Sequence, residues 1–337
     1  MPTTTHLGLD LYGTRVRVRS SVAAATRALR DRLAPFLREP LEGAELALDL
    51  VPARAHHRAA AARVAPQLRW ERSRPLWGQC DATTLALTDG ASLARIDYGA
   101  GRARLAIAAS TAREPALFAR TFLLLPLLEL LRTRGLFFVH GALVTRGRES
   151  VLLLGRGGGG KSTLAAALLR CGWRLVADDN LLLRLERGRP RLWPLEQELS
   201  LAPTVLRQLG LATGNADPTT KQRLPLDRLP ASLRASHAVA PRRVLVLAPA
   251  AGDVGLRPLA RSAVLTLLLE ENPMLWAQPA LAAAHLGALR ALLQPARCWR
   301  YAAPRLTPLD LEQLGRRCHA DLSLEKNAGR AIDVKLG

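Results

Sequence analysis

The chain has 337 residues, of which 49% are hydrophobic and 23% charged, a balance typical of folded proteins and not of disordered ones. This length is enough for two domains. The formal net charge is +20, and only 4% of the residues are aromatic. Because the arginines are spread along the chain without a dense basic block or interleaved aromatic residues, we expect no nucleic-acid partner. An acidic partner of another kind is the alternative that the charge leaves open.

The cysteines and the apolar segments exclude further classes of protein. The cysteines lie far apart and form no Cys-x-x-Cys pair, so the sequence predicts neither a zinc site nor a disulfide framework. The first residues lack the basic and apolar regions of a signal peptide. The most apolar stretch, residues 117–131, is interrupted by Arg120, Pro126 and Glu129 and is too short to span a bilayer. We therefore expect a cytoplasmic protein with no membrane partner.

The first part of the chain predicts an α+β domain over residues 1–112. Residues 7–19 alternate between apolar and polar side chains, as in a strand or hairpin, and residues 21–38 have helical spacing. Further strand-like runs cover residues 44–51, 82–87, 94–98 and 103–108. The domain shows no recognisable chemistry, and recognition of a substrate is the role that we assign to it.

A second domain is predicted over residues 113–321, followed by a poorly ordered tail over 322–337. A helix is expected over 115–133, and a hairpin follows, with strands over 136–144 and 150–154 and a polar turn between them. The later expected strands cover residues 174–177, 181–185, 191–194 and 243–247. The later expected helices cover residues 161–171, 203–210, 259–269 and 281–293. The predicted fold class is α/β with a mixed sheet.

The segment that carries the clearest chemistry reads Gly-Arg-Gly-Gly-Gly-Gly-Lys-Ser, residues 155–162, and fits the phosphate-binding pattern G-x-x-x-x-G-K-[ST]. It follows an apolar strand-like run and precedes good helix formers, which is the context that the pattern requires. Glycines let backbone N–H groups approach phosphate oxygens, and a helix N-terminus adds its positive dipole end. A glycine-rich surface loop is the structural alternative. The predicted nucleotide-binding residues are Gly155, Arg156, Gly157, Gly158, Gly159, Gly160, Lys161, Ser162 and Thr163.

Two side chains of this loop have predicted roles. Lys161 would reach the β- and γ-phosphates, and the Ser162 hydroxyl would bind Mg²⁺. The chain is rich in arginine and has four lysines, Lys161, Lys221, Lys326 and Lys335. A lysine in such a chain suits a place where a compact point charge is needed, which makes Lys221 a second candidate for phosphate contact.

A pair of acidic residues, Asp178 and Asp179, ends the apolar run 174–177. A helix of about eleven residues rises roughly 16 Å, so the chain after it has just enough length to return as an adjacent strand. That return brings both carboxylates back to the loop, where they are placed to bind Mg²⁺ or to accept a proton. The alternative is that Asp-Asp-Asn begins a turn.

The order of these motifs resembles the HPr kinase and phosphoenolpyruvate-carboxykinase-like superfamily. The matching segments are Val-His-Gly-Ala-Leu-Val at 139–144, the loop at 155–163, and Cys-Gly-Trp-Arg-Leu-Val-Ala-Asp-Asp at 171–179. The resemblance implies a P-loop kinase core of that superfamily preceded by the α+β domain. The chain lacks the glycine-rich C-terminal signature of HPr kinases, and its N-terminal half differs from their sensor domain. It is more similar to HprK-related serine kinases associated with lasso-peptide and PqqD-like genes.

The resemblance also implies roles for single residues. Asp178 would accept the proton of the attacking hydroxyl, and Asp179 would hold Mg²⁺ together with Ser162. His140 would lie near the transferred phosphate, although a structural strand histidine is the alternative. The remaining implied residues are Lys221 and Arg223, which would neutralise phosphate charge unless they form a solvated turn, and Glu196 and Glu198, which are weaker candidates for substrate or metal contact.

The expected activity is therefore transfer of the γ-phosphate of ATP, with Mg²⁺, to a hydroxyl of a small protein or precursor peptide, most simply a serine. GTP is the alternative nucleotide. A P-loop ATPase or switch without a phosphoacceptor and a kinase of a small metabolite are the alternative functions. The sequence leaves the oligomeric state open, and a homo-oligomer is among the states that it allows.

Overall fold

The computed structural model describes residues 4–39, 42–71, 75–114, 118–195, 198–211, 220–235, 238–248, 255–303 and 310–333. The chain forms two compact units. The N-terminal unit comprises Met1–Phe138 and Pro273–Gly287, and the C-terminal unit comprises Val139–Asn272 and Ala288–Gly337. The division after Phe138 lies later in the chain than the expected boundary at residue 112. The helical segment that was expected to open the second domain belongs to the N-terminal unit.

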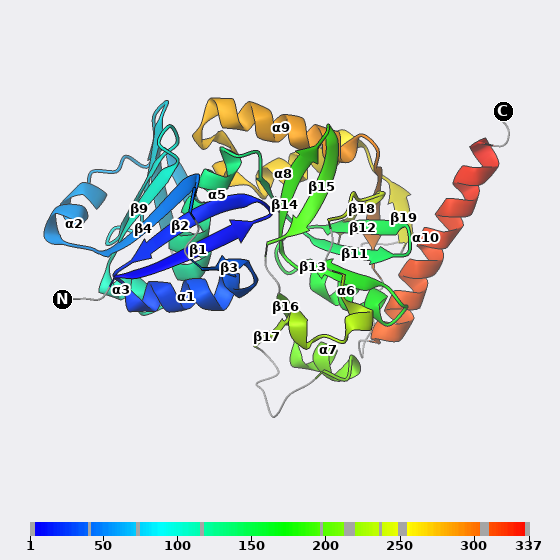
Figure 1. Ribbon diagram of the computed structural model, residues 1–337. Helices are drawn as coiled ribbons and strands as arrows, with labels where there is room; N and C mark the ends of the chain where they lie inside the picture. The colour runs from blue at the N-terminus through cyan, green and yellow to red at the C-terminus, as the bar shows by residue number, and fades with distance from the viewer. Residues whose placement is uncertain are drawn as a thin grey trace. The chain divides into compact units, whose positions relative to one another are not determined.

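The N-terminal unit contains a nine-stranded mixed sheet in the order β3-β1-β2-β4-β9-β8-β7-β6-β5 (Figure 1). Its strands are β1 (Thr5–Leu11), β2 (Thr14–Ser20), β3 (Leu37–Arg38), β4 (Leu46–Pro52), β5 (Leu68–Glu71), β6 (Pro75–Cys80), β7 (Thr84–Thr88), β8 (Leu93–Asp97) and β9 (Arg102–Ile107). Its helices are α1 (Ala23–Leu33), α2 (Ala55–Ala61), α3 (Ala109–Ala112), a π-helical turn (Ala119–Leu123) and α5 (Leu124–Arg132), with 3₁₀ turns at Ala34–Phe36 and Pro273–Ala277. The expected hairpin and strands are present, whereas the helix expected over residues 21–38 ends at Leu33. The elements that were not predicted are β3, β5, β6, α2 and α3.

The C-terminal unit contains a six-stranded mixed sheet in the order β13-β11-β12-β18-β20-β19. Its strands are β11 (Ala142–Arg146), β12 (Glu149–Leu154), β13 (Arg174–Ala177), β18 (Arg243–Ala248), β19 (Gly255–Pro258) and β20 (Arg297–Ala302). A smaller sheet joins β10 (Phe137–His140), β14 (Asn180–Glu186) and β15 (Arg189–Pro194), and a two-stranded ribbon joins β16 (Glu198–Leu201) to β17 (Gln222–Pro225). The mixed α/β class expected from the sequence is confirmed.

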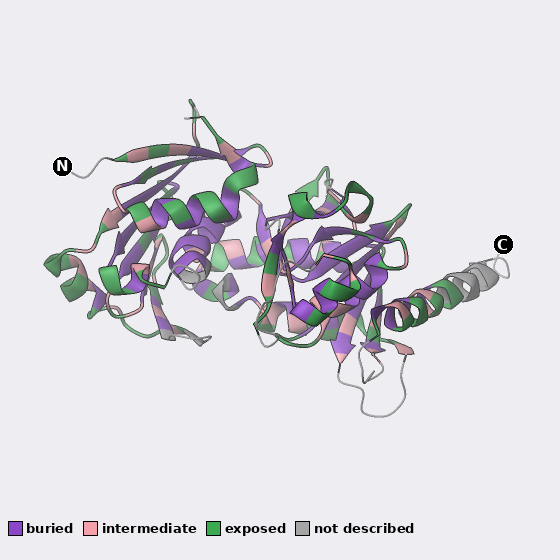
Figure 2. Cartoon of the chain, turned by 90° about the horizontal axis from the view of Figure 1, so that it is seen from below, coloured by how far each residue is buried: buried purple, intermediate pink, exposed green. Residues whose placement is uncertain are grey.

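The helices from residue 139 onward are α6 (Lys161–Leu169), α7 (Pro203–Gln208), α8 (Arg261–Glu270), α9 (Pro279–Leu293) and α10 (Leu311–Asp333), with 3₁₀ turns at Leu226–Arg228 and Ala231–Leu233. Figure 2 shows the buried residues on the sheets and on the helix faces that pack against them. No helix in the described part of the chain combines the length and the apolar character that a membrane crossing requires.

The expected tail over residues 322–337 is helical as far as Asp333, beyond which the residues are not described. The helix α10 buries Leu311, Leu314, Cys318 and Leu322 in the same core as α6. This spacing of three and four residues places the four side chains on one helix face, whereas a poorly ordered tail was expected from residue 322 onward. Gly315 allows close packing, because a Cβ there would collide with the backbone of Ala167 in α6.

The expected strand over residues 136–144 is divided into β10 and β11 at Gly141. The Gly141 amide donates a hydrogen bond to the Asp179 carbonyl oxygen at 2.9 Å, away from the ladder of β11 and β12. A Cβ at position 141 would lie 2.9 Å from the Leu153 carbonyl oxygen, so any other residue would push the strands apart. The division allows β10 to join a different sheet from β11.

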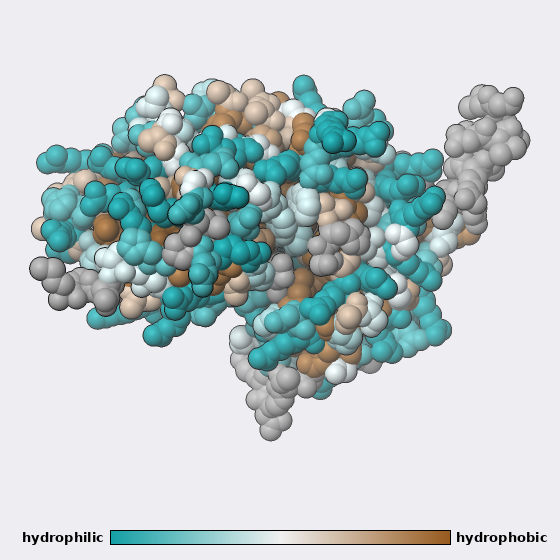
Figure 3. Space-filling view, in the orientation of Figure 1, coloured by the Kyte–Doolittle hydropathy of each residue, from teal (hydrophilic) through white to brown (hydrophobic). Residues whose placement is uncertain are grey.

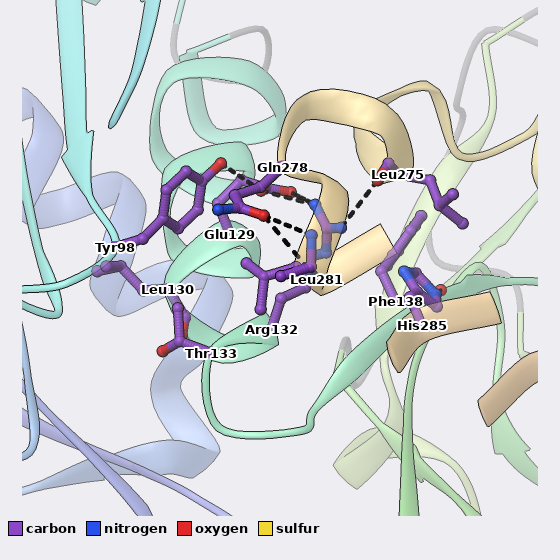
Figure 4. Close-up of polar contacts among 11 residues, drawn as sticks. Tyr98, Glu129, Leu130, Arg132, Thr133, Phe138, Leu275, Gln278, Leu281 and His285 are labelled. Carbon is purple, nitrogen blue, oxygen red and sulfur yellow. Dashed lines mark hydrogen bonds and ion pairs between the residues drawn. The ribbon is translucent and has the colours of Figure 1, made fainter. Parts of the chain in front are cut away.

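A buried ion pair lies in the core of the N-terminal unit (Figure 4). Arg132 donates from Nη1 to both carboxylate oxygens of Glu129, at 2.8 and 2.7 Å, and from Nη2 to the Leu275 carbonyl oxygen at 2.9 Å. The Tyr98 hydroxyl donates to Glu129 at 2.8 Å. The side chains of Arg132 and Glu129 are only 2% and 1% exposed, and burial raises the pKa of the Glu129 carboxyl. Both charges therefore depend on each other for stabilisation.

We predict that Glu129→Leu lowers the free energy of unfolding by about 3–5 kcal/mol, because it leaves a buried guanidinium without its counter-ion. The matched control is Glu45→Gln, which removes a pair with Arg134 whose side chains are 45% and 40% exposed. That pair should contribute less than about 1 kcal/mol. Urea unfolding of the two variants measures the difference, and equal losses would contradict the assignment.

Candidate active site

Three strands of the six-stranded sheet deliver the candidate residues to one edge. β11 runs antiparallel to both β12 and β13, so β12 and β13 are parallel and their carboxyl ends lie at the same edge. The amino end of β11 lies there as well, since Ala142 pairs with Leu153 and Leu143 pairs with Ala177. The return strand was expected to be directly adjacent to β12, and the structure instead places β11 between them. The glycine-rich loop, the two aspartates and His140 nevertheless flank this one edge.

The segment after β12 has the strand, loop and helix order that the sequence predicted. Gly160 is the N-cap of α6 and has a φ of 89°, a left-handed conformation that glycine adopts without strain. The N–H groups of the first helical turn have no acceptor within the helix and point toward the loop. Lys161 is 7% exposed, and its Nζ donates to the Gly155 carbonyl oxygen at 2.6 Å. Its ammonium group is thus held at the loop.

Asp178 is the buried carboxylate of the site, with 2% exposure. Its Oδ2 accepts a hydrogen bond from the Ser200 amide at 3.2 Å, and its side chain is hydrogen-bonded to Ser162, the second residue of α6. Burial raises the pKa of Asp178 to about 6, and the hydrogen bonds from Ser200 and Ser162 oppose that rise. A carboxylate held next to the loop with a raised pKa is suited to accept a proton.

Asp179 points in a different direction from its neighbour. It has a φ of 95°, which is uncommon for a residue with a side chain, and its side chain is 40% exposed. Its Oδ1 lies 3.2 Å from Nδ1 of His140, whose side chain is 8% exposed. The hydrogen bond from the Gly141 amide holds the backbone of Asp179 in this conformation. Two adjacent carboxylates therefore occupy different environments, one buried and one accessible.

The ribbon of β16 and β17 adds basic residues near Asp178. Arg223 lies opposite Ser200 in the register and forms an ion pair with Glu198 at 3.4 Å. Lys221 is exposed, and its charge is among the influences that lower the pKa of Asp178, after burial and the hydrogen bonds. The ribbon thus brings both predicted basic residues to the side of the site on which Asp178 lies. Glu196 lies outside the described residues.

Two contacts of the site were not predicted. Ser200 supplies the amide bond to Asp178, and no feature of its short alternating segment distinguishes it in the sequence. Arg156, in the loop, pairs with Glu270 at the end of α8 at 3.5 Å, and both side chains are largely exposed. Ser200 is 22 residues from Asp178, and Glu270 is 114 residues from Arg156, so only the fold brings each pair together.

The oxygen donors of the site fit a hard cation of the Mg²⁺ type. Within the described residues, no group of three or more His, Cys, Asp and Glu side chains forms a closed metal cage. Mg²⁺ binds instead through one or two carboxylates together with substrate phosphates and water. The Ser162 hydroxyl and the Asp178 carboxylate are in contact, and the Asp179 carboxylate follows directly in the chain. The expected pairing of Ser162 with Asp179 stays a prediction.

Comparisons with known proteins add little to this geometry. No family model matches the chain, and no curated protein matches it. A solved structure of the Hpr(Ser) kinase/phosphatase from Coxiella burnetii aligns with 58% of this chain and 96% of its own, at 13% sequence identity and a TM-score of 0.33. An alignment at this level carries no inference about activity.

We predict that Asp178→Asn stabilises the metal-free protein above pH 6. The pKa of Asp178 is about 6 in the folded chain, against an ordinary 3.8. Between pH 3.8 and pH 6 the folded chain therefore retains a proton on Asp178 that the unfolded chain has released. Stability therefore falls as the pH rises through this window, by up to about 3 kcal/mol. Asparagine does not titrate, and its amide oxygen still accepts from Ser200.

Urea unfolding in the presence of EDTA at pH 4 and pH 8 tests this prediction. Asp178→Asn should exceed the parent in stability at pH 8 and approach it at pH 4. The control Asp179→Asn changes the neighbouring, more exposed carboxylate to a residue that tolerates positive φ, and should stay within about 1 kcal/mol of the parent. If the parent gained stability relative to Asp178→Asn between pH 4 and pH 6, the predicted direction of the pH dependence would be wrong.

Proposed function

We propose that this chain is an ATP- and Mg²⁺-dependent kinase that transfers the γ-phosphate to a hydroxyl, a serine hydroxyl in the simplest case, of a small protein or precursor peptide. The observation that carries the proposal is the contact between the buried Asp178 carboxylate and Ser162. Ser162 lies in the first turn of α6, the helix that the glycine-rich loop opens. A phosphate-binding loop and a proton acceptor within one loop, helix and strand unit suit transfer to a hydroxyl. The sequence resemblance to HprK-related serine kinases supports the same activity.

The loop would bind the triphosphate. Backbone N–H groups at the start of α6 and the Lys161 ammonium would contact phosphate oxygens, which would replace the Gly155 carbonyl as the partner of Nζ. Lys221 and Arg223 would neutralise further negative charge, and the present pair of Arg223 with Glu198 is exposed enough to exchange. Ser162 and Asp179 would hold Mg²⁺, which when bound supplies charge neutralisation on the phosphates.

In the transfer step, the acceptor oxygen forms a bond to the γ-phosphorus while the bond from that phosphorus to the bridging β-phosphate oxygen breaks. ADP is the leaving group, and the proton of the acceptor hydroxyl passes to the Asp178 carboxylate. His140, whose Nδ1 lies 3.2 Å from Oδ1 of Asp179, would orient the Asp179 carboxylate and lie near the transferred group. Most of the catalysis then comes from positioning and from stabilisation of charge.

We predict that Lys161→Ala and Asp178→Asn each lower the rate of phosphate transfer by about 100-fold or more, for different reasons. Lys161→Ala removes a phosphate contact and should also weaken nucleotide binding. Asp178→Asn removes the proton acceptor and should bind nucleotide with little change. Lys335→Ala, far outside the loop in the sequence, is the control for loss of a lysine.

The assay incubates the full chain, Mg²⁺ and γ-labelled ATP with peptides encoded beside its gene, and follows the label on peptide and on free phosphate. Mass spectrometry of the same peptides after co-expression should show the addition of one phosphoryl group. Label found only in free phosphate would replace the proposal with the ATPase or switch alternative. Transfer at the normal rate by Asp178→Asn would show that the proposed base is wrong.

A further inference from the structure

A group of exposed arginine side chains lies on one face of the nine-stranded sheet of the N-terminal unit. Along β2, residues alternate strictly, so that Arg15, Arg17 and Arg19 are exposed while Val16 and Val18 are fully buried. Side chains two residues apart on a strand share a face and lie roughly 6.6–7 Å apart. One strand therefore presents a regular line of three guanidinium groups.

The neighbouring strands continue this charge in register. Arg19 is paired with Asp49 of β4, Asp49 with Arg104 of β9, and Arg104 with Arg95 of β8. The next row contains Arg17, Ala47, Arg102 and Asp97 in the same strand order. We call the exposed arginines of these two rows, together with Arg15, the arginine face: Arg15, Arg17, Arg19, Arg95, Arg102 and Arg104. The two rows hold five arginines and two carboxylates, and Asp10 of β1 lies opposite Arg15.

The opposite face of the same strands is the core of the unit. Leu48, Leu105 and Val18 are fully buried there, and the helices α1 and α5 pack against β2, β8 and β9. Figure 3 shows hydrophilic side chains gathered over β1 and β2 on the viewer's side of this unit. The arginines thus lie outside this core. The helix α2 also contacts β8, and burial together with the charges of residues that include Arg104 and Arg95 lowers the pKa of its His57.

A hollow of about 390 Å³ lies on this face, and its lining includes Thr4, His6, Arg19, Asp49 and Arg104. Arg19 donates to both oxygens of Asp49, at 2.7 and 3.0 Å. The hydrogen bond from Arg19 lowers the pKa of Asp49 against the effect of burial, and the charges of Arg102 and Arg104 lower it further. The single Asp49 carboxylate therefore neutralises only part of the positive charge of Arg19, Arg102 and Arg104, and an excess of positive charge remains at the hollow.

We propose that the arginine face binds an acidic polypeptide segment of a partner protein. Carboxylates two residues apart in an extended peptide have the same spacing as the arginines of β2, and guanidinium groups bind carboxylates in a bidentate manner. The proposal goes beyond the kinase activity and does not depend on it, because none of these residues belongs to the candidate active site.

The composition of the face favours a polypeptide over a nucleic acid or a membrane. The two rows contain no Phe, Tyr or Trp on which a base would stack. Asp49 and Asp97 interrupt the positive charge, which disfavours the uniform charge of a phosphate backbone and suits carboxylates placed singly. The two rows carry no large apolar side chain that would insert into a lipid surface, and of the apolar residues that line the hollow, Leu50 is buried and Val51 is partly buried.

The test measures binding of a fluorescein-labelled peptide of alternating Glu and Ser residues to the full chain at low salt, by fluorescence anisotropy. Arg17→Gln combined with Arg102→Gln should raise the Kd at least about tenfold, because two charge-assisted contacts to the peptide are lost. The control combines Arg27→Gln with Arg30→Gln, which removes the same charge from the exposed side of α1. It should change the Kd less than about twofold, and thermal unfolding should show that both variants remain folded.

Three results would overturn the proposal. The parent could fail to bind the Glu-Ser peptide at low salt, or the α1 control could weaken binding as much as the Arg17 and Arg102 variant does. A single-stranded oligothymidylate or vesicles containing phosphatidylserine could also bind more tightly than the peptide in a manner that needs Arg17 and Arg102. That last result would assign the face to a nucleic acid or to a lipid surface instead.

Discussion

The contact between the buried Asp178 carboxylate and the Ser162 hydroxyl connects the two segments on which the candidate site depends. Ser162 lies in the first turn of α6, and Asp178 follows β13, the strand to which the chain returns after that helix. A carboxylate with 2% exposure is costly unless it is hydrogen-bonded, and here Ser162 and the Ser200 amide meet that need. This contact places a buried carboxylate beside the end of the glycine-rich loop, where the proposed transfer needs a proton acceptor.

Much of this arrangement is visible in the sequence, since it depends on local order. The apolar run before residue 155, the glycines, and the helix formers after Lys161 predict strand, loop and helix, and residues 174–177 are a strand with the expected bounds. The features of the site that the sequence did not reveal are non-local. The insertion of β11 between β12 and β13 is a matter of strand pairing, and the division at Gly141 depends on the close approach of Leu153. Ser200 contributes only its backbone amide, for which no residue type is diagnostic.

The large excess of arginine serves different purposes in different places. In the core of the N-terminal unit, Arg132 is buried with Glu129, where the pair is stabilising only as a pair. On the arginine face, the guanidinium groups of Arg17 and Arg102 are exposed and arranged by strand register. At the glycine-rich loop the chain uses a lysine, whose compact charge suits contact with a phosphate. The net charge of the chain is thus the sum of separate local requirements, which explains why the arginines form no basic block in the sequence.

The proposed function depends first on binding of a nucleotide triphosphate by the glycine-rich loop and Lys161 beside Asp178. Calorimetric titration of the full chain with the non-hydrolysable analogue AMP-PNP, in the presence of Mg²⁺, tests it without any assumption about the acceptor. The parent should bind the analogue at one site per chain, and Lys161→Gln should bind it at least about tenfold more weakly. Replacement of Mg²⁺ by EDTA should cause a marked loss of affinity. Absence of binding to the parent, or equal binding by Lys161→Gln, would contradict it.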